Sequence, residues 1–202
     1  MTIGTAPIVP VEEFDPRAYL RDGSVAALRV SRPADHGALR RFFHELSPGS
    51  RQHRFFSLAE PPETLIDAFC DSSDPTRQAT LVARRLEDEG LQLVAVASYL
   101  DLGNGVAEAA FAVADAVQGR GLGTILLERL AKLAAANGFR RFNAIVLSEN
   151  RAMLEVFRSS GFQIGSKAQH GIVTVALESS ARQKPVQLEI FPRTWENTSR
   201  SP

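Results

Sequence analysis

A glycine-rich segment at the start of a strongly helical pattern constrains this chain more than any other feature. Residues 118–124 read Gln-Gly-Arg-Gly-Leu-Gly-Thr, with glycine at every second position. Glycine tolerates positive φ and has no Cβ, so the segment can turn tightly and bring successive N–H groups close to an anion. The helix that follows adds about half a positive charge at its N-terminus, and Arg120 can pair with a phosphate through two hydrogen bonds. The segment predicts a diphosphate site.

Spacing distinguishes the ligands that such a turn can hold. A P-loop needs lysine before Ser or Thr at the helix start, and no lysine occurs from Gln118 to Thr124. A dinucleotide fingerprint aligned on Gly119 and Gly121 would need a small residue at Thr124, and it would begin directly after a strand. Residues 115–118 intervene instead. A turn that only connects a strand to a helix is the structural alternative.

The length of the chain favours one domain. With 202 residues, 44% of them hydrophobic, it can bury one full core. We expect a domain over residues 17–180, between a proline-containing tail (1–16) and a polar tail (181–202). Residues 186–195 are apolar for a tail and could pack on the domain or on a second copy, so both a monomer and a homodimer stay open.

Charge and cysteine content exclude several classes of protein. Lys+Arg and Asp+Glu both total 23, which argues against a nucleic-acid binder. Cys70 is the lone cysteine; it has no partner for an internal disulfide, and we expect a small buried residue. No apolar run reaches the ~18 residues of a membrane helix, no signal-peptide pattern is present, and no set of side chains has metal-ligand spacing. We expect a cytoplasmic protein that binds neither membrane nor metal.

The apolar pattern changes its period several times along the chain. Helical periodicity predicts a helix that includes residues 39–46, with its start marked by Pro33 and Asp35, and a short helix over 62–69. A third helix is expected after residues 118–124, and a fourth between Asn150 and Gly161. Pro48-Gly49 is expected to end the first, and Asn137-Gly138 the third. Strands are expected over residues 79–85, 91–100, 106–113, 142–147, 162–164 and 172–177. One strand-helix-strand unit within a largely antiparallel sheet predicts an α+β or mixed α/β layer architecture.

Two motifs resemble those of a known family. Gln118 to Gly123 matches the Q/R-x-x-G-x-G/A signature of the GNAT N-acetyltransferases, and the segment from Asn150 to Phe162 resembles the one that follows it in that family. The N-terminal part is similar to bacterial protein-lysine acetyltransferases and to acetyltransferase domains fused to acyl-CoA synthetases. That similarity is carried by residues 20–23, 32–35, 42–47 and 54–57.

The resemblance implies a twisted, mostly antiparallel mixed sheet of about six to seven strands with about four helices, and acetyl-CoA as cosubstrate. It implies that the strand ending at Val113 splays from residues 142–147. Asn150 would bond the pantetheine arm near the thioester, and it is equally well placed as a helix N-cap. Main-chain groups would hold the arm and the pyrophosphate; the residues are Phe111, Ala112 and Val113 for the arm, and Gln118, Gly119, Arg120, Gly121, Leu122, Gly123 and Thr124 for the pyrophosphate.

Acetyl transfer to an amine needs a base, because a lysine with a pKa of ~10.4 is almost wholly protonated at neutral pH. Glu108 interrupts the apolar run of residues 106–111. It matches the strand glutamate that serves as base in the related lysine acetyltransferases. The alternative is a solvent-facing carboxylate. Period two places Glu108, Ala110 and Ala112 on one face of the strand.

The other catalytic groups are less well defined by the sequence. A main-chain N–H within residues 111–113 would meet the oxyanion. Many family members carry a tyrosine in the helix after Asn150 to protonate the leaving thiolate, and Phe157 takes that place here. Since a thiol has a pKa near ~8.5, the thiolate can leave without a side-chain acid.

The acceptor is suggested mainly by the N-terminal half. We expect a lysine ε-amine of a protein, for which an acyl-CoA synthetase is one candidate. A small amine is the second hypothesis, and a non-catalytic acyl-CoA-binding module is the third. The basic residues 51–54 could contact an acidic acceptor surface, although for Arg54 a structural ion pair is the favoured role.

Overall fold

The computed structural model describes residues 16–88 and 90–178, which form one eight-stranded sheet in the order β1-β2-β3-β4-β5-β6-β8-β7. β5 and β6 are parallel and every other neighbouring pair is antiparallel. The strands are β1 (Arg17–Tyr19), β2 (Val25–Val30), β3 (Gln78–Glu87), β4 (Gly90–Gly103), β5 (Val106–Val113), β6 (Arg141–Leu147), β7 (Gln163–Gln169) and β8 (Ile172–Glu178).

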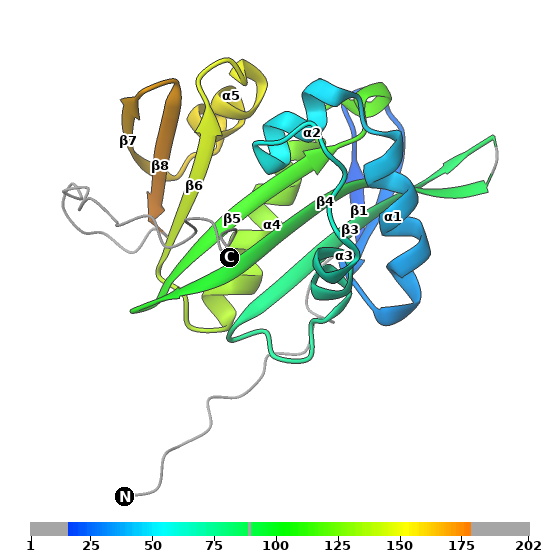
Figure 1. Cartoon of the computed structure of the whole chain (residues 1–202), viewed down its shortest axis with the longest axis horizontal. Helices are drawn as coiled ribbons and strands as arrows, with labels where there is room; N and C mark the ends of the chain where they lie inside the picture. The colour runs from blue at the N-terminus through cyan, green and yellow to red at the C-terminus, as the bar shows by residue number, and fades with distance from the viewer. Residues whose placement is uncertain (1–15, 89, 179–202) are drawn as a thin grey trace, which may run out of the picture.

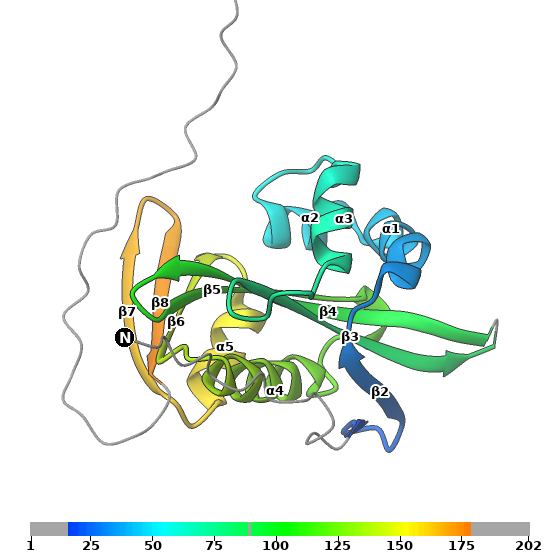
Figure 2. The same cartoon turned by 90° about the horizontal axis from the view of Figure 1, so that it is seen from below.

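Helices cover both faces of the sheet. Figure 1 shows the strands in order, and Figure 2 shows α1, α2 and α3 on one face with α4 and α5 on the other. Their bounds are α1 (His36–Glu45), α2 (Pro48–Phe55), α3 (Glu63–Cys70), α4 (Leu122–Ala136) and α5 (Arg151–Ser159). The mixed architecture predicted from the sequence is confirmed, with one strand more than the upper expectation and one additional helix.

Two apolar cores hold the layers together. The larger lies between the sheet and α4, where Leu126 and Leu130 are fully buried. The smaller lies under α1 and α3. There Phe43 is fully buried and its ring packs 5.1 Å from Phe42, 5.2 Å from Phe55 and 5.5 Å from Phe69, between ring centroids. The aromatic contacts fix the three N-terminal helices to one another and to the sheet.

The sequence prediction missed three elements. β1 and β2 were not expected. The third missed element is α2: Pro48-Gly49 was expected only to end the first helix, and Pro48 is instead the first residue of α2. Ser47 caps α2 by accepting a hydrogen bond from the Ser50 N–H at 3.2 Å. Proline suits the first helical position because its missing N–H would have had no helical partner. The predicted tails lie outside the described residues, apart from residue 16 at the edge of the first.

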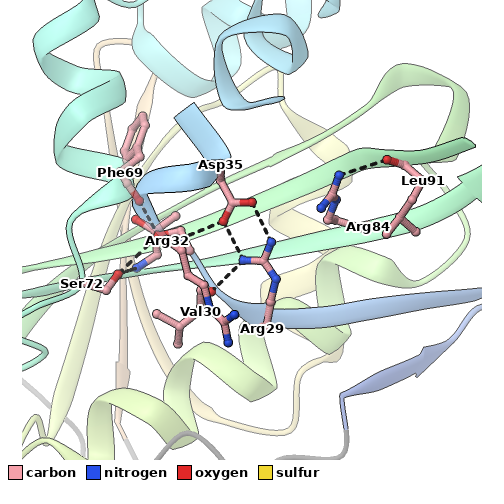
Figure 3. A network of polar contacts seen from close by, with 10 residues as sticks. Arg29, Val30, Arg32, Asp35, Phe69, Ser72, Arg84 and Leu91 are labelled. Atoms are coloured by element: carbon pink, nitrogen blue, oxygen red, sulfur yellow. Dashed lines mark hydrogen bonds and ion pairs between the residues drawn. The ribbon is translucent and has the colours of Figure 1, made fainter. Parts of the chain in front are cut away.

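A buried ion pair fixes the entry into α1. Figure 3 shows the Arg29 guanidinium of β2 donating two hydrogen bonds to the Asp35 carboxylate, each of 2.6 Å. Asp35 also accepts the Arg32 N–H at 2.8 Å, and its side chain is only 4% exposed. The Arg29 hydrogen bonds lower the pKa of Asp35 and outweigh its burial. The carboxylate therefore stays charged and joins α1 to the sheet.

We predict that Asp35→Asn destabilises the fold by about 3 kcal/mol, because Arg29 loses its charged partner in a buried setting. The lowered pKa of Asp35 means that its contribution is complete above the unfolded-state pKa and is lost as pH falls through the folded-state value. Denaturant unfolding as a function of pH measures both effects. In acid, where Asp35 becomes protonated, the difference in stability between wild type and D35N should disappear.

Glu155→Gln, which alters an exposed pair with Arg158, is the control, and its stability should stay within about 0.5 kcal/mol of wild type. Equal stability of D35N and wild type at neutral pH would contradict the prediction.

Candidate functional site

β5 and β6 separate after a short parallel ladder. They pair only from Val106 to Glu108 on β5 and from Arg141 to Asn143 on β6. β5 continues to Val113, and β6 continues to Leu147 while staying paired with β8. One edge of β5 is therefore released from its neighbour, which is the splay that the resemblance implied.

Hydrogen bonding to β4 shows which backbone groups face the opening. The Ala114 N–H donates to Val94 O at 2.9 Å, and Ala112 lies opposite Val96. Backbone N–H and C=O groups alternate sides along a strand. The backbone groups of the even-numbered β5 residues therefore point toward β4, and those of Phe111 and Val113 point toward the splay. Of the three residues predicted to pair the pantetheine arm, Ala112 thus has its main chain directed to β4 and its side chain in the smaller core.

The glycine-rich segment forms the predicted tight turn into α4. Gly119 and Gly121 have φ of 75° and 88°, and Gly121 is the N-cap residue. The N–H groups of the first helical turn have no helical acceptors and are free for an anion. Gly123 permits close packing of α4 on α5, since a Cβ there would lie 3.2 Å from Val156 Cγ2. The segment has the backbone geometry of an anion site.

Arg120 is held by the loop between β1 and β2. Its guanidinium donates to the Asp22 carboxylate and, at 2.9 Å, to Ala116 O. The Arg21 side chain lies over the turn, with Nε 3.4 Å from the position that a Gly121 Cβ would take. Sequence reasoning used residues 20–23 only for the resemblance and assigned neither Arg21 nor Asp22 to this site. Nothing in the local sequence pattern predicts their approach.

Gln118 and Asp115 attach α2 to the glycine-rich turn of residues 118–124. The Gln118 amide donates to Val113 O at 3.0 Å and to Ser50 Oγ at 3.1 Å. Asp115 accepts the N–H and Oγ–H of Ser47 and the Oγ–H of Ser50. Burial raises the pKa of Asp115, but these hydrogen bonds outweigh it and leave the pKa lowered. The N-terminus of α2 is thereby fixed beside the end of β5.

Asn150 and Phe157 lie on the α5 side of the splay. Asn150 caps α5, since its Oδ1 accepts the Met153 N–H at 3.1 Å, and it also lines the cavity described next. Phe157 is 1% exposed, and its ring packs edge-on against Phe111 at 6.2 Å between centroids. An apolar contact therefore stands where many family members have a phenol.

A cavity of about 230 Å³ opens between the separated strands. α2 supplies one wall, β5 and β6 the floor, and α5 the other wall. Its polar and charged side chains are His53, Arg54, Glu108 and Asn150. His53 Nε2 lies 4.0 Å from Glu149 Oε1, across the opening between α2 and the start of α5.

Glu108 lies in this cavity and is neither a core residue nor a fully solvated carboxylate. Its residue is partly buried, on the strand face that carries Ala110 and Ala112. Burial raises the pKa of Glu108, and the charge of Arg54 acts in the opposite direction. A carboxylate with a raised pKa in a cavity has the character of a general base.

Three further expectations concern Cys70, metal binding and membrane-spanning helices. Cys70 is buried, as expected, and burial raises the pKa of its thiol. Within residues 16–88 and 90–178, no cluster of His, Cys, Asp and Glu is arranged to hold a metal ion. Over the same residues, every helix is too short or too polar to span a bilayer.

Comparison with known proteins identifies the family. The sequence model of the acetyltransferase (GNAT) family matches residues 39–162. Acetyltransferase PA5475 of Pseudomonas aeruginosa is 33% identical over 145 residues, which cover 71% of this chain and 77% of that protein. The chain belongs to the GNAT acetyltransferase family. It is an acyltransferase, with acetyl-CoA as its cosubstrate.

Solved structures agree with this assignment. The GNAT domain of S. lividans PAT is 31% identical, with a TM-score of 0.71, and the match covers 80% of this chain and 95% of that domain. The putative acetyltransferase YncA of Salmonella typhimurium, solved with acetyl-CoA, has a TM-score of 0.62 at 21% identity, over 81% of this chain and 99% of that protein. The second match supports the fold.

We predict that Gly121→Ala weakens acetyl-CoA binding about tenfold, since forcing a Cβ into a left-handed conformation costs about 1–2 kcal/mol and turns the adjacent N–H groups. Calorimetric titration with acetyl-CoA measures the affinity. Gly49→Ala is the matched control, because that glycine lies in α2 with open space around its Cβ position; its affinity should equal that of wild type. Unchanged binding by G121A would show that the turn does not hold the cofactor.

Proposed function

We propose that this GNAT protein acetylates a lysine ε-amine of a protein acceptor by direct attack on acetyl-CoA, with Glu108 as general base. The observation that carries the proposal is the position of Glu108 in the cavity between the separated strands, with its pKa raised by burial.

The chain offers complementary groups along the length of acetyl-CoA. The turn of residues 118–124 would hold the pyrophosphate with backbone N–H groups. Arg120 would join it if the phosphate replaces Asp22 as the guanidinium's partner. The main-chain groups of Phe111 and Val113 would pair the pantetheine amides. Asn150, which caps α5 at the cavity wall, would lie near the thioester.

The proposed reaction begins with proton removal from the ammonium form of the acceptor. Glu108 accepts that proton, and the neutral amine nitrogen attacks the thioester carbonyl carbon. A new C–N bond forms as the carbonyl π electrons move to oxygen. A β5 main-chain N–H directed into the splay, from Phe111 or Val113, stabilises the oxyanion. Glu108 then retains the proton while the intermediate collapses.

Collapse breaks the C–S bond and releases CoA as a thiolate. Phe157 and Phe111 form an apolar contact at this wall and supply no proton. A thiol pKa near ~8.5 makes the thiolate a tolerable leaving group at neutral pH. The acetylated nitrogen loses its extra proton to solvent, and solvent protonates the thiolate, so that the products are a neutral amide and the CoA thiol.

The place of Glu108 in the cavity favours a lysine as acceptor. Glu108 is the last β5 residue paired with β6 and lines the cavity, where a long unbranched stem could deliver an amine to it. Phe56 lines the cavity and stays 39% exposed, so it presents an apolar surface at the rim. A protein acceptor can bury this ring, whereas a small amine leaves it in water.

We predict that Glu108→Gln lowers kcat for acetylation of a lysine-containing protein by about 10²–10⁴-fold, because the amide cannot accept the proton. Acetyl-CoA affinity should be unchanged, since Glu108 is not part of the cofactor turn. The assay follows CoA release, and mass spectrometry locates the acetyl group, with acyl-CoA synthetases and small amines included as acceptors.

Glu155→Gln is the control for this experiment, as it makes the same chemical change in an exposed carboxylate. It should retain wild-type kcat. Turnover by E108Q equal to that of wild type would remove Glu108 from the mechanism. Efficient acetylation of small amines, with no protein lysine modified, would instead overturn the proposed acceptor.

A further inference from the structure

Arg54 has an unusual environment for an arginine. It lies near the C-terminal end of α2, with its guanidinium carbon 5.0 Å from the centre of the Phe55 ring and 5.1 Å from that of Phe69. Its Nη2 donates to Ser98 Oγ at 3.0 Å. Its Nε is buried without a hydrogen-bond partner. The aromatic rings and one hydroxyl thus hold a cation in place while leaving part of it unsatisfied.

This cation is close to Glu108 without forming a direct pair with it. Ser98 lies opposite Ala110 in the β4–β5 register, and Ala110 and Glu108 share one face of β5. Both Arg54 and Glu108 line the cavity. Among the described residues, no carboxylate oxygen lies within 4.0 Å of a side-chain nitrogen of Arg54, the distance that defines an ion pair. Burial lowers the pKa of Arg54 to about 10, with Glu108 acting to raise it, so Arg54 remains charged at neutral pH.

We propose that Arg54 is a positioning residue whose fixed charge keeps Glu108 ionised in the cavity and thus able to accept the acceptor's proton. The inference rests on the proposed role of Glu108. It also explains why α2 retains a partly buried cation that has no direct ion pair within the described residues, since an uncompensated charge away from water is costly to a fold.

The separation between the Arg54 guanidinium and the Glu108 carboxylate matters for proton transfer to Glu108. A direct, two-pronged pair would occupy the carboxylate oxygens that must receive the proton, and it would lower the basicity of Glu108 strongly. Burial without a cation would raise the pKa of Glu108 further and reduce the fraction of Glu108 that is ionised at a given pH. A cation held nearby by Ser98, Phe55 and Phe69 opposes the effect of burial and leaves the oxygens free. A larger fraction of Glu108 is then ionised at any given pH.

Other groups around Glu108 do not supply this charge. His53, the neighbouring residue on α2, faces Glu149. β4 contributes Ser98 and Leu100, and β6 contributes Asn143 opposite Glu108. Asn150 is the polar residue from the α5 side. Within the described part of the chain, Arg54 is the arginine that lines the cavity, and its guanidinium is charged throughout the neutral range.

The test is the pH dependence of kcat/KM in Arg54→Met, which removes the charge and retains an apolar stem. Without the cation, Glu108 holds its proton to higher pH. We expect kcat/KM relative to wild type to be reduced about tenfold at about pH 6 and to recover toward wild type at about pH 9. The ratio of variant to wild type cancels the ionisation of the acceptor amine. Arg54→Lys should restore most of the wild-type profile.

Arg40→Met is the matched control, since Arg40 is an exposed α1 residue paired with Glu63; its ratio to wild type should be flat with pH. A flat loss in R54M at every pH would overturn the proposal and leave only a structural or acceptor-binding role. Circular dichroism verifies folding, and Arg54→Gln replaces R54M if the methionine variant does not fold.

A second measurement separates this proposal from the proposed reaction. Infrared difference spectra, with Glu108→Gln as the blank, follow the Glu108 carboxylate band as pH is changed and need no acceptor. The band should appear at higher pH in the variant lacking the Arg54 charge than in wild type. Coincident titrations would overturn the role of Arg54 even if lysine acetylation is observed. A clear displacement without any lysine acetylation would support the electrostatic inference and reject the acceptor.

Discussion

The separation of β5 from β6 is the constraint on which the rest of the site depends. A parallel ladder that ends at Glu108 and Asn143 leaves the remaining edge of β5 without a strand partner. Unpaired backbone groups are costly to bury, so this edge is stable where it meets solvent or a ligand that can pair with it. Beyond Asn143 the edge of β6 that faces β5 is in the same position, because β8 pairs with β6 on the other edge. Phe111 and Phe157 fill the space between β5 and α5 on one face of the sheet.

α2 closes the opposite side of the opening and determines its electrostatics. The start of this helix is joined to the glycine-rich turn by hydrogen bonds among Ser47, Ser50, Asp115 and Gln118. The end of the helix carries His53 and Arg54 into the cavity. α2 therefore links the proposed pyrophosphate-binding end of the site to the proposed catalytic end. The balance at Glu108 is between burial, which disfavours its charge, and Arg54, which favours it.

The predictable part of the fold had strong local signals. β5 was predicted over its full observed range, because an apolar run follows a Gly-Asn-Gly turn. The missed elements lacked such signals. β1 has three residues, and β2 contains two alanines, which have low strand propensity. α2 is polar and begins with Pro-Gly. Its helical state depends on the Ser47 cap and on the contacts of Phe55 and Arg54, which come from other parts of the chain.

The sequence by itself determined the glycine-rich turn, the Asn150 cap and the face of β5 that carries Glu108, because φ preference, capping and strand alternation act over a few residues. Only the tertiary structure decided that the Ala112 backbone turns to β4, that Asp22 holds Arg120, and that Arg54 lies beside Glu108. Coulomb interactions and burial depend on distances through space. Those distances are set by how β4, β5 and α2 pack together, and no local pattern in the sequence encodes them.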